Sequence, residues 1–176
     1  EVMIASANDI KNERTGSKIV FKVADFLNFN SKILCKPQYD FVITDRMLIN
    51  LNSWELQQKA LKKLISLLKP SGHLIVIENF TNSYANQNHL RSILGLPPRV
   101  PDAYNKFIDE GDFEKMTKNE LSAEIIFSKN FASLHDILLY VLLPHSNSGS
   151  LCYDHPVMES VTQLLLDLPD ELSESF

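Results

Sequence analysis

The sequence predicts an α/β protein with a mostly parallel sheet, and two strand patterns and one helix pattern support this prediction. Residues 41–43 and 74–77 are short, continuous apolar runs rich in β-branched side chains, which is typical of strands buried on both faces. Between them, apolar side chains recur at helical spacing, namely Trp54, Leu61, Leu64, Ile65 and Leu68. A strand, a helix and a second strand in this order form a crossover unit, which joins parallel strands.

The helix of this unit has recognisable ends. Asn52 is a favourable N-cap residue, and Glu55 three positions later completes a capping-box-like start. Pro70 and Gly72 are expected to end the helix and to turn the chain back into the second strand. The face opposite the apolar side chains carries lysines at positions 59, 62, 63 and 69.

Upstream of the crossover unit, the pattern predicts a helix, a strand and a connection. Residues 2–13 place apolar side chains on one helical face. Residues 18–23 alternate between apolar and polar side chains, as a strand with one less buried face does. Residues 26–38 connect this strand to the next.

Downstream, short helices are predicted first. Residues 90–98 form a helix that Gly95 and two prolines end, and residues 112–118 form a helix that Asp109 or Asp112 caps. Both lie in a polar stretch, residues 79–120, that follows a buried strand, and loops beyond the carboxyl ends of parallel strands bind ligands in α/β proteins.

The last part of the chain is expected to complete the sheet. Residues 123–127 and 137–143 are predicted to be two further strands, antiparallel to each other or nearly so. Residues 155–168 are predicted to form a helix with Val157, Val161, Leu164 and Leu165 facing inward, followed by a frayed tail over residues 169–176. All of these elements are assigned to one domain, residues 1–176.

Composition and charge argue against several classes of function. Apolar residues make up 44% and charged residues 22% of the chain, as in ordinary globular proteins. The net charge of −5 argues against a nucleic-acid partner, because phosphate binding requires a basic face. No apolar run is long enough to span a membrane. The histidines show no metal-ligand spacing, and Cys35 and Cys152 are expected to be free thiols in a reducing, cytoplasmic setting.

Two motifs in the crossover unit resemble a known family. Residues 39–46 read Tyr-Asp-Phe-Val-Ile-Thr-Asp-Arg, and residues 68–78 read Leu-Lys-Pro-Ser-Gly-His-Leu-Ile-Val-Ile-Glu. They resemble the fourth and fifth motifs of class I S-adenosylmethionine-dependent methyltransferases, with Ser71 in place of the usual first glycine. Residues 20–27 resemble the third motif, and residues 1–7 resemble the stretch after the second strand. The resemblance implies a Rossmann-like sheet with a closing antiparallel strand, and S-adenosylmethionine as the cofactor.

The glycine-rich first motif of that family is not present in the sequence, which contains five glycines in no such cluster. The resemblance therefore implies an N-terminally truncated domain, the C-terminal two-thirds of a methyltransferase. We expect the strand at residues 18–23 to be displaced onto a sheet edge or poorly packed. We also expect little cofactor affinity and little activity from this fragment alone.

The resemblance also implies site residues. Met3, Asp25, Phe26, Thr44 and Asp45 would contact the cofactor. For Met3 the alternative is a core side chain, and for Asp25 it is a cap of the next turn.

Two residues are candidates for the chemistry. Arg46 would orient an anionic acceptor, with a surface salt bridge as the alternative. Glu78 would be a general base, with a hydrogen-bonded structural acid as the alternative.

Residues 79–120 would then form the lid over a polar, small-molecule acceptor. The candidate acceptor contacts are Asn79, His89, Arg91, Tyr104 and Asn105, each of which is alternatively an ordinary polar loop residue.

The sequence thus predicts methyl transfer from S-adenosylmethionine to an unidentified small molecule. The alternative is a non-catalytic binding or scaffold module whose open sheet edge pairs with a partner chain, including a second copy in a homodimer. A nucleotide-dependent dehydrogenase is a weaker third option, since no glycine fingerprint is available to test it.

Overall fold

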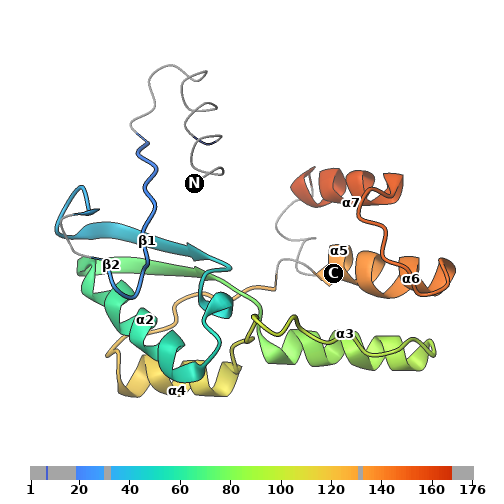
Figure 1. Cartoon of the computed structure of the whole chain (residues 1–176), viewed down its shortest axis with the longest axis horizontal. Coiled ribbons are helices and arrows are strands. Elements are labelled where there is room, and N and C mark those ends of the chain that lie inside the picture. Colours follow the sequence, from blue (N-terminus) through green and yellow to red (C-terminus); the bar gives the residue numbers. More distant parts are fainter. Residues whose placement is uncertain (1–6, 8–18, 30–32, 131–132, 168–176) are drawn as a thin grey trace.

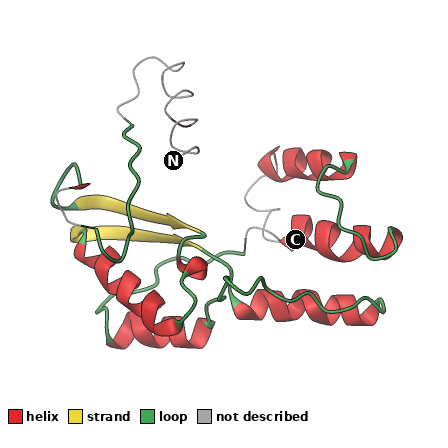
Figure 2. Cartoon of the chain, in the orientation of Figure 1, coloured by secondary structure: helices red, strands yellow, loops and turns green. Residues whose placement is uncertain are grey.

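A parallel pair of strands and the helix that joins them lie together at the left of the structure in Figure 1. The structure, a computed structural model, describes residue 7 and residues 19–29, 33–130 and 133–167. The elements are β1 (Tyr39–Asp45), η2 (Leu48–Asn50), α2 (Trp54–Ser66), β2 (Leu68–Ile77), α3 (Thr81–Ile93), α4 (Glu110–Asn119), α5 (Ser133–Ile137), η3 (Leu138–Leu142), α6 (Leu143–Ser146) and α7 (Pro156–Asp167). Figure 2 shows how strongly helices predominate in this set. None of the described helices is both long and apolar enough to cross a bilayer.

The predicted crossover unit is confirmed. β1 and β2 are parallel, with Phe41 opposite His73 and Ile43 opposite Ile75. The register is irregular near the start of the pair, where a Cβ on Gly72 would lie 3.0–3.1 Å from backbone carbonyl oxygens. Ser71 beside it has a φ of 63°, a left-handed conformation that favours glycine, so the residue that departs from the family motif sits in a glycine-like position.

The helix boundaries differ from the prediction by a few residues. The N-cap of α2 is Ser53, whose side chain accepts a hydrogen bond from the Leu56 N–H at 3.3 Å, so the assignment of Asn52 as the cap was wrong. Asn and Ser are nearly equal N-caps, so the sequence could not separate them. The helix also ends at Ser66, before Pro70 and Gly72, which both lie within β2.

One face of the sheet packs on the core. The buried core residues come from η2, α2, α4 and the loop before α4, and they are Leu48, Ala60, Leu61, Leu64, Ile108 and Met116. Val42, Leu74 and Val76 contribute the sheet's side of this core. The prediction of an apolar face on α2 is therefore confirmed for Leu61 and Leu64, which are buried in this core.

The other face of the sheet is bare among the described residues. Phe41 and Ile43 are each 61% exposed, and Ile75 and Ile77 are 40% and 48% exposed. The expectation that both strands are buried on both faces is therefore wrong for this face.

The expected further strands are not observed. Residues 19–23 have no strand pairing and are largely exposed, in agreement with the expectation of poor packing. Residues 123–127 are also irregular and mostly exposed, so a strand there was wrong. The described residues hold only the two parallel strands, and a closing antiparallel strand is not among them. The expected helix at residues 2–13 lies outside the described residues.

The apolar run at residues 137–143 is helical, which corrects the prediction of a strand. It forms the end of α5, the π-helical segment η3 and the start of α6. Leu139, Leu143 and Met158 make a second, smaller buried cluster with α7. Continuous apolar runs of this length do not distinguish a buried strand from a buried helix, which is why the pattern misled us.

The remaining helices match their predictions in type. Asp109 caps α4 by accepting the Asp112 N–H at 3.0 Å, and Gly95, with a φ of 69°, follows the end of α3. α3 begins nine residues before the predicted start at residue 90, at Thr81. In α7, Val161 is buried as expected, but Leu164 is 50% exposed.

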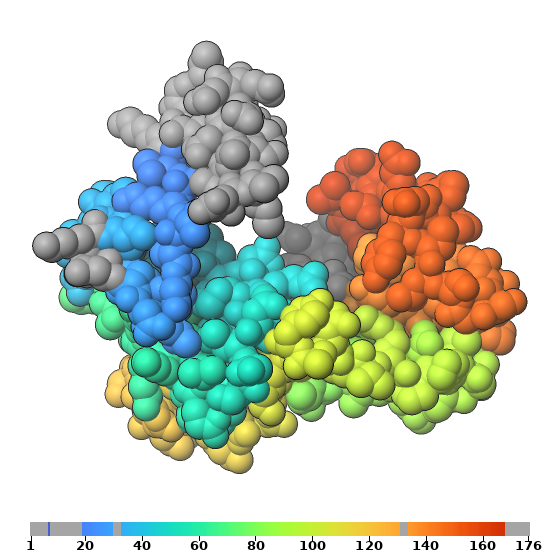
Figure 3. All heavy atoms as spheres, viewed as in Figure 1, coloured from blue at the N-terminus to red at the C-terminus, as the bar shows by residue number. Residues whose placement is uncertain are grey.

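α3 links the two cores. In Figure 3 the atoms of α3 lie against those of residues 133–167, apart from most of the sheet. Arg91 of α3 donates to the carbonyl oxygen of Tyr140, and Gln87 of α3 donates to the Asp136 carboxylate at 2.6 Å. Polar side chains of α3 therefore hold the C-terminal helices.

Candidate functional site

The carboxyl ends of β1 and β2 form an edge at which the chain reverses twice. The ladder closes with the Arg46 N–H donating to the Ile77 carbonyl oxygen at 2.8 Å. The next residue after β2, Glu78, reaches across to the turn that follows β1. Its carboxylate accepts the N–H groups of Met47, Leu48 and Ile49 at 3.0, 2.9 and 3.2 Å.

These three bonds define the role of Glu78. Both carboxylate oxygens are engaged at the amino end of η2, where unpaired backbone N–H groups favour a negative charge. Of the two alternatives for this residue, the geometry favours the structural acid over the free base. Glu78 fixes the turn after β1 against the end of β2.

Arg46 stands at this edge in a strained conformation. Its φ is 50°, its side chain is exposed, and its carbonyl oxygen accepts the Asn50 side-chain amide. Left-handed non-glycine residues of this kind cluster at functional sites. Its guanidinium is within electrostatic range of Tyr104, whose hydroxyl donates to the Asp102 carboxylate at 2.9 Å. That hydrogen bond raises the pKa of Tyr104, and the positive charge of Arg46 partly opposes the effect.

Thr44 and Asp45 point to opposite faces, because they are neighbours in a strand. Thr44 is 3% exposed, and its hydroxyl has no hydrogen-bond partner among the described residues. Asp45 is exposed, on the same side as Ile43. The two residues therefore share the edge but not one surface.

Asp25 and Phe26 lie elsewhere. Asp25 accepts the Leu27 N–H at 3.0 Å and the Asn28 side-chain amide at 2.8 Å, and the Asn28 bond is the main cause of its lowered pKa. This is the capping alternative that the sequence left open.

The Asp25–Phe26 turn is fixed to the end of α2. Lys63, in the last turn of α2, donates to Leu27 and lies 5.5 Å from the Phe26 ring centre. This end of α2 leads directly into the start of β2, so the turn is near the amino edge of the sheet. The structure does not bring Asp25 and Phe26 together with Thr44 and Asp45. Met3 lies outside the described residues.

The acceptor candidates divide into two groups. Asn79 and the segment around Asn105 lie beside the strand edge, since Asn79 accepts the Ile108 N–H at 3.1 Å and Lys106 donates its N–H to Ile49 at 2.8 Å. His89 is exposed on α3. Arg91, in contrast, is 5% exposed and bonded towards the C-terminal helices, which separates it from Asn105.

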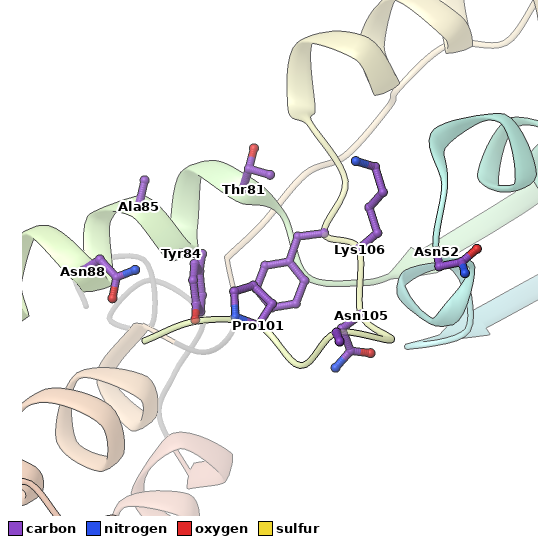
Figure 4. A pocket seen from close by; sticks show the side chains of 10 residues that line it. Asn52, Thr81, Tyr84, Ala85, Asn88, Pro101, Asn105 and Lys106 are labelled. Atoms are coloured by element: carbon purple, nitrogen blue, oxygen red, sulfur yellow. The ribbon is translucent and has the colours of Figure 1, made fainter. Parts of the chain in front are cut away.

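A groove lies between α3 and the loop of residues 101–107. Its volume is about 570 Å³, within the range of small-molecule sites. Figure 4 shows the polar side chains along it. The lining residues are Asn52, Thr81, Tyr84, Ala85, Asn88, Pro101, Ala103, Asn105, Lys106 and Phe107. Of the predicted acceptor contacts, only Asn105 is among the lining residues.

Gln57 organises this region and was not predicted. It is fully buried on α2, and its amide nitrogen donates to the carbonyl oxygens of Leu48, Leu51 and Lys106 at 3.1, 3.3 and 2.7 Å. It therefore ties the turn after β1 to the groove's loop. The only available signal was a single glutamine on the buried face of an amphipathic helix. Among the described residues, no group of three or more His, Cys, Asp or Glu side chains could hold a metal ion.

Comparison with known protein families identifies the family of the protein. A family model described as "Methyltransferase domain" matches residues 1–94, just over half of the chain. The chain belongs to the class I S-adenosylmethionine-dependent methyltransferases. The match spans the β1–α2–β2 unit, Glu78 and all of α3. No curated protein and no solved structure matches the chain significantly.

Proposed function

We propose that this methyltransferase domain transfers the methyl group of S-adenosylmethionine to a small polar acceptor, which binds in the groove between α3 and residues 101–107. One observation carries the proposal. The groove's walls include Asn52, which follows β1 and η2, and Thr81, which follows β2. The groove therefore opens beside the carboxyl edge of the sheet, where α/β proteins bind their ligands.

The residues at this edge fit the methionine end of the cofactor. The backbone of residues 44–46 would flank it, because this stretch ends β1 at the carboxyl edge of the sheet and Arg46 is exposed there. When bound, S-adenosylmethionine supplies an electrophilic methyl group on a sulfonium. We assign no adenine contact to Asp25 or Phe26, since the Lys63 contacts hold their turn at the other edge.

The protein's contribution is positioning. Holding two reactants in line supplies about 7–11 kcal/mol of barrier lowering, so this reaction needs little covalent help. Glu78 and Gln57 would be positioning residues, because they fix the turn after β1 and the groove's loop. Arg46 and Asn105 would orient the acceptor. Residues 79–120, which return to η2 through the Lys106–Ile49 bond, would be the lid.

The test uses the full-length protein. It is incubated with S-adenosylmethionine and the small-molecule fraction of an extract from its source cells, and S-adenosylhomocysteine is measured. We expect product only when the extract is present. The Asn105→Ala variant should raise the KM for the extract fraction, with cofactor affinity unchanged. Failure to bind S-adenosylmethionine in titration calorimetry would contradict the proposal.

The rival scaffold function is distinguished by the same preparation. Pairing through the open edge of β1 or β2 predicts a stable dimer in sedimentation and no cofactor binding. Membership of a methyltransferase family favours the enzyme, and we therefore do not propose the scaffold role.

A further inference from the structure

Positive charge surrounds the groove, although the whole chain has a net charge of −5. Lys106 lines the groove, and none of the lining residues is acidic. The Arg99 guanidinium lies 5.3 Å from the ring centre of Tyr84, another lining residue, and 3.5 Å from the Tyr140 ring centre. Cationic side chains are therefore present both on the loop wall and beside the α3 wall.

Arg91 adds a charge that no carboxylate among the described residues neutralises. It is 5% exposed, and its guanidinium donates to the carbonyl oxygens of Pro97, at 2.8 Å, and Tyr140. Neither Arg91 nor Arg99 forms a salt bridge with a described carboxylate. Burial, and then the charge of Arg99, lower the pKa of Arg91. Buried charges are normally paired, so this excess of positive charge calls for an explanation.

Tyr84 presents an unused donor in the same place. Its ring packs edge-on against Phe107, with 4.8 Å between ring centres. Its hydroxyl is buried and has no hydrogen-bond partner in the described part of the chain. Burial raises the pKa of the Tyr84 hydroxyl above its usual value. A buried donor without an acceptor destabilises a fold, unless a ligand provides the acceptor.

Three acidic groups lie near the groove and offset this charge only in part. The Asp136 carboxylate accepts a hydrogen bond from Gln87, whose side-chain oxygen in turn accepts one from Arg99, so Asp136 faces Arg99 through Gln87 and forms no ion pair with it. Asp102 accepts the Tyr104 hydroxyl, and Glu55 interacts with Lys106 only at long range, without an ion pair. Asp102 and Glu55 are exposed, so water and salt screen them more than the buried guanidinium.

We propose that the groove binds an anionic small molecule carrying a carboxylate or a phosphate, with the Lys106 ammonium pairing with the anion and the Tyr84 hydroxyl donating to another oxygen of the same ligand. Figure 4 shows the two side chains extending in different directions from the loop and from α3, so a ligand that contacts both has to extend along the groove. The identification of this ligand as the methyl acceptor rests on the proposed function; the anion site itself does not.

The experiment measures binding without cofactor, so its result is independent of methyl transfer. Succinate and inorganic phosphate are the anionic probes, and glucose is the neutral probe, each followed by titration calorimetry and thermal unfolding of the full gene product. The wild type should bind at least one anion and not glucose. Lys106→Gln should weaken anion binding about tenfold, which corresponds to about 1.4 kcal/mol. Lys118→Gln, an exposed lysine on α4, removes the same charge away from the groove and should change nothing.

Tyr84→Phe separates a ligand contact from a structural one. Removing an unsatisfied hydroxyl should raise the unfolding temperature of the free protein by roughly 2–4 °C and weaken anion binding. Which probe binds distinguishes a carboxylate from a phosphate. The proposal is overturned if neither anion binds up to tens of millimolar, if glucose binds as well, if Lys106→Gln and Lys118→Gln behave alike, or if Tyr84→Phe lowers the unfolding temperature.

Discussion

The region around the sheet and the C-terminal helices are stabilised in different ways. The first, residues 39–120, has a core of six buried side chains with exposures of 0–3%. The second, residues 133–167, has a buried cluster of three, with exposures of 2–8%, and is attached to α3 through arginine and glutamine side chains. Hydrophobic burial should therefore dominate the stability of the first region, and polar contacts should decide whether the second stays attached.

The largest expected effect is a core deletion in the first region. Leu61→Ala removes a fully buried side chain from α2 and should reduce the free energy of unfolding by about 2–5 kcal/mol. Trp54, the single tryptophan, begins the same helix and reports this region's unfolding by fluorescence. Leu164→Ala, at a residue 50% exposed on α7, is the matched control and should move the Trp54 transition by less than about 0.5 kcal/mol. Equal effects of the two substitutions would contradict the comparison.

A smaller loss is expected at the functional edge. Glu78→Ala leaves the N–H groups at the start of η2 without their acceptor, so it should cost roughly 2–3 kcal/mol. Hydrogen exchange should accelerate at Met47, Leu48 and Ile49. Glu114→Ala, on the exposed surface of α4, is the control. Unchanged exchange at those three amides would show that Glu78 does not hold the turn.

Substitution of Arg99 should weaken the attachment of the C-terminal helices more than it lowers the stability of the first region. Arg99→Ala removes a guanidinium stacked on Tyr140 and bonded to Gln87, a loss of about 1–2 kcal/mol. Limited proteolysis should then cleave within residues 133–167 sooner, while the Trp54 transition stays in place. If Arg99→Ala also lowers the midpoint of the Trp54 transition, the two regions unfold as one cooperative unit and the prediction is wrong.

The smallest expected effect is a gain. Ser71→Gly relieves a φ of 63° at the start of β2 and should stabilise the first region by about 0.5–1 kcal/mol. Gly95→Ala makes the opposite change after α3, where φ is 69° and space is open around the missing Cβ. It should destabilise the protein by a similar amount. If Ser71→Gly destabilises the protein, the serine side chain makes a stabilising contact that outweighs the strain of its left-handed backbone.

The sequence predicted the first region better than the second, for physical reasons. In residues 39–77 the strand runs are short and bounded by turn residues, and the helix between them has one apolar face, so each pattern has one interpretation. The run at residues 137–143 is apolar throughout, which suits a buried strand and a buried helix equally. The family resemblance favoured the strand and led to the wrong choice.

The sequence predicted that the candidate site lies at the carboxyl edge of the sheet, but it did not predict which groups its side chains contact. Motifs located Arg46 and Glu78 next to each other, because the carboxyl ends of parallel strands meet. They could not show that the Glu78 carboxylate is occupied by backbone N–H groups, since that depends on the path of η2. Gln57 was missed for the same reason: its three acceptors come from segments up to 49 positions away.

The most direct test of the proposed function is a crystal structure of the full gene product with S-adenosylhomocysteine. We predict that the thioether sulfur lies beside residues 44–46, at the mouth of the groove between α3 and residues 101–107. Product bound away from that edge, with the groove facing elsewhere, would contradict the account.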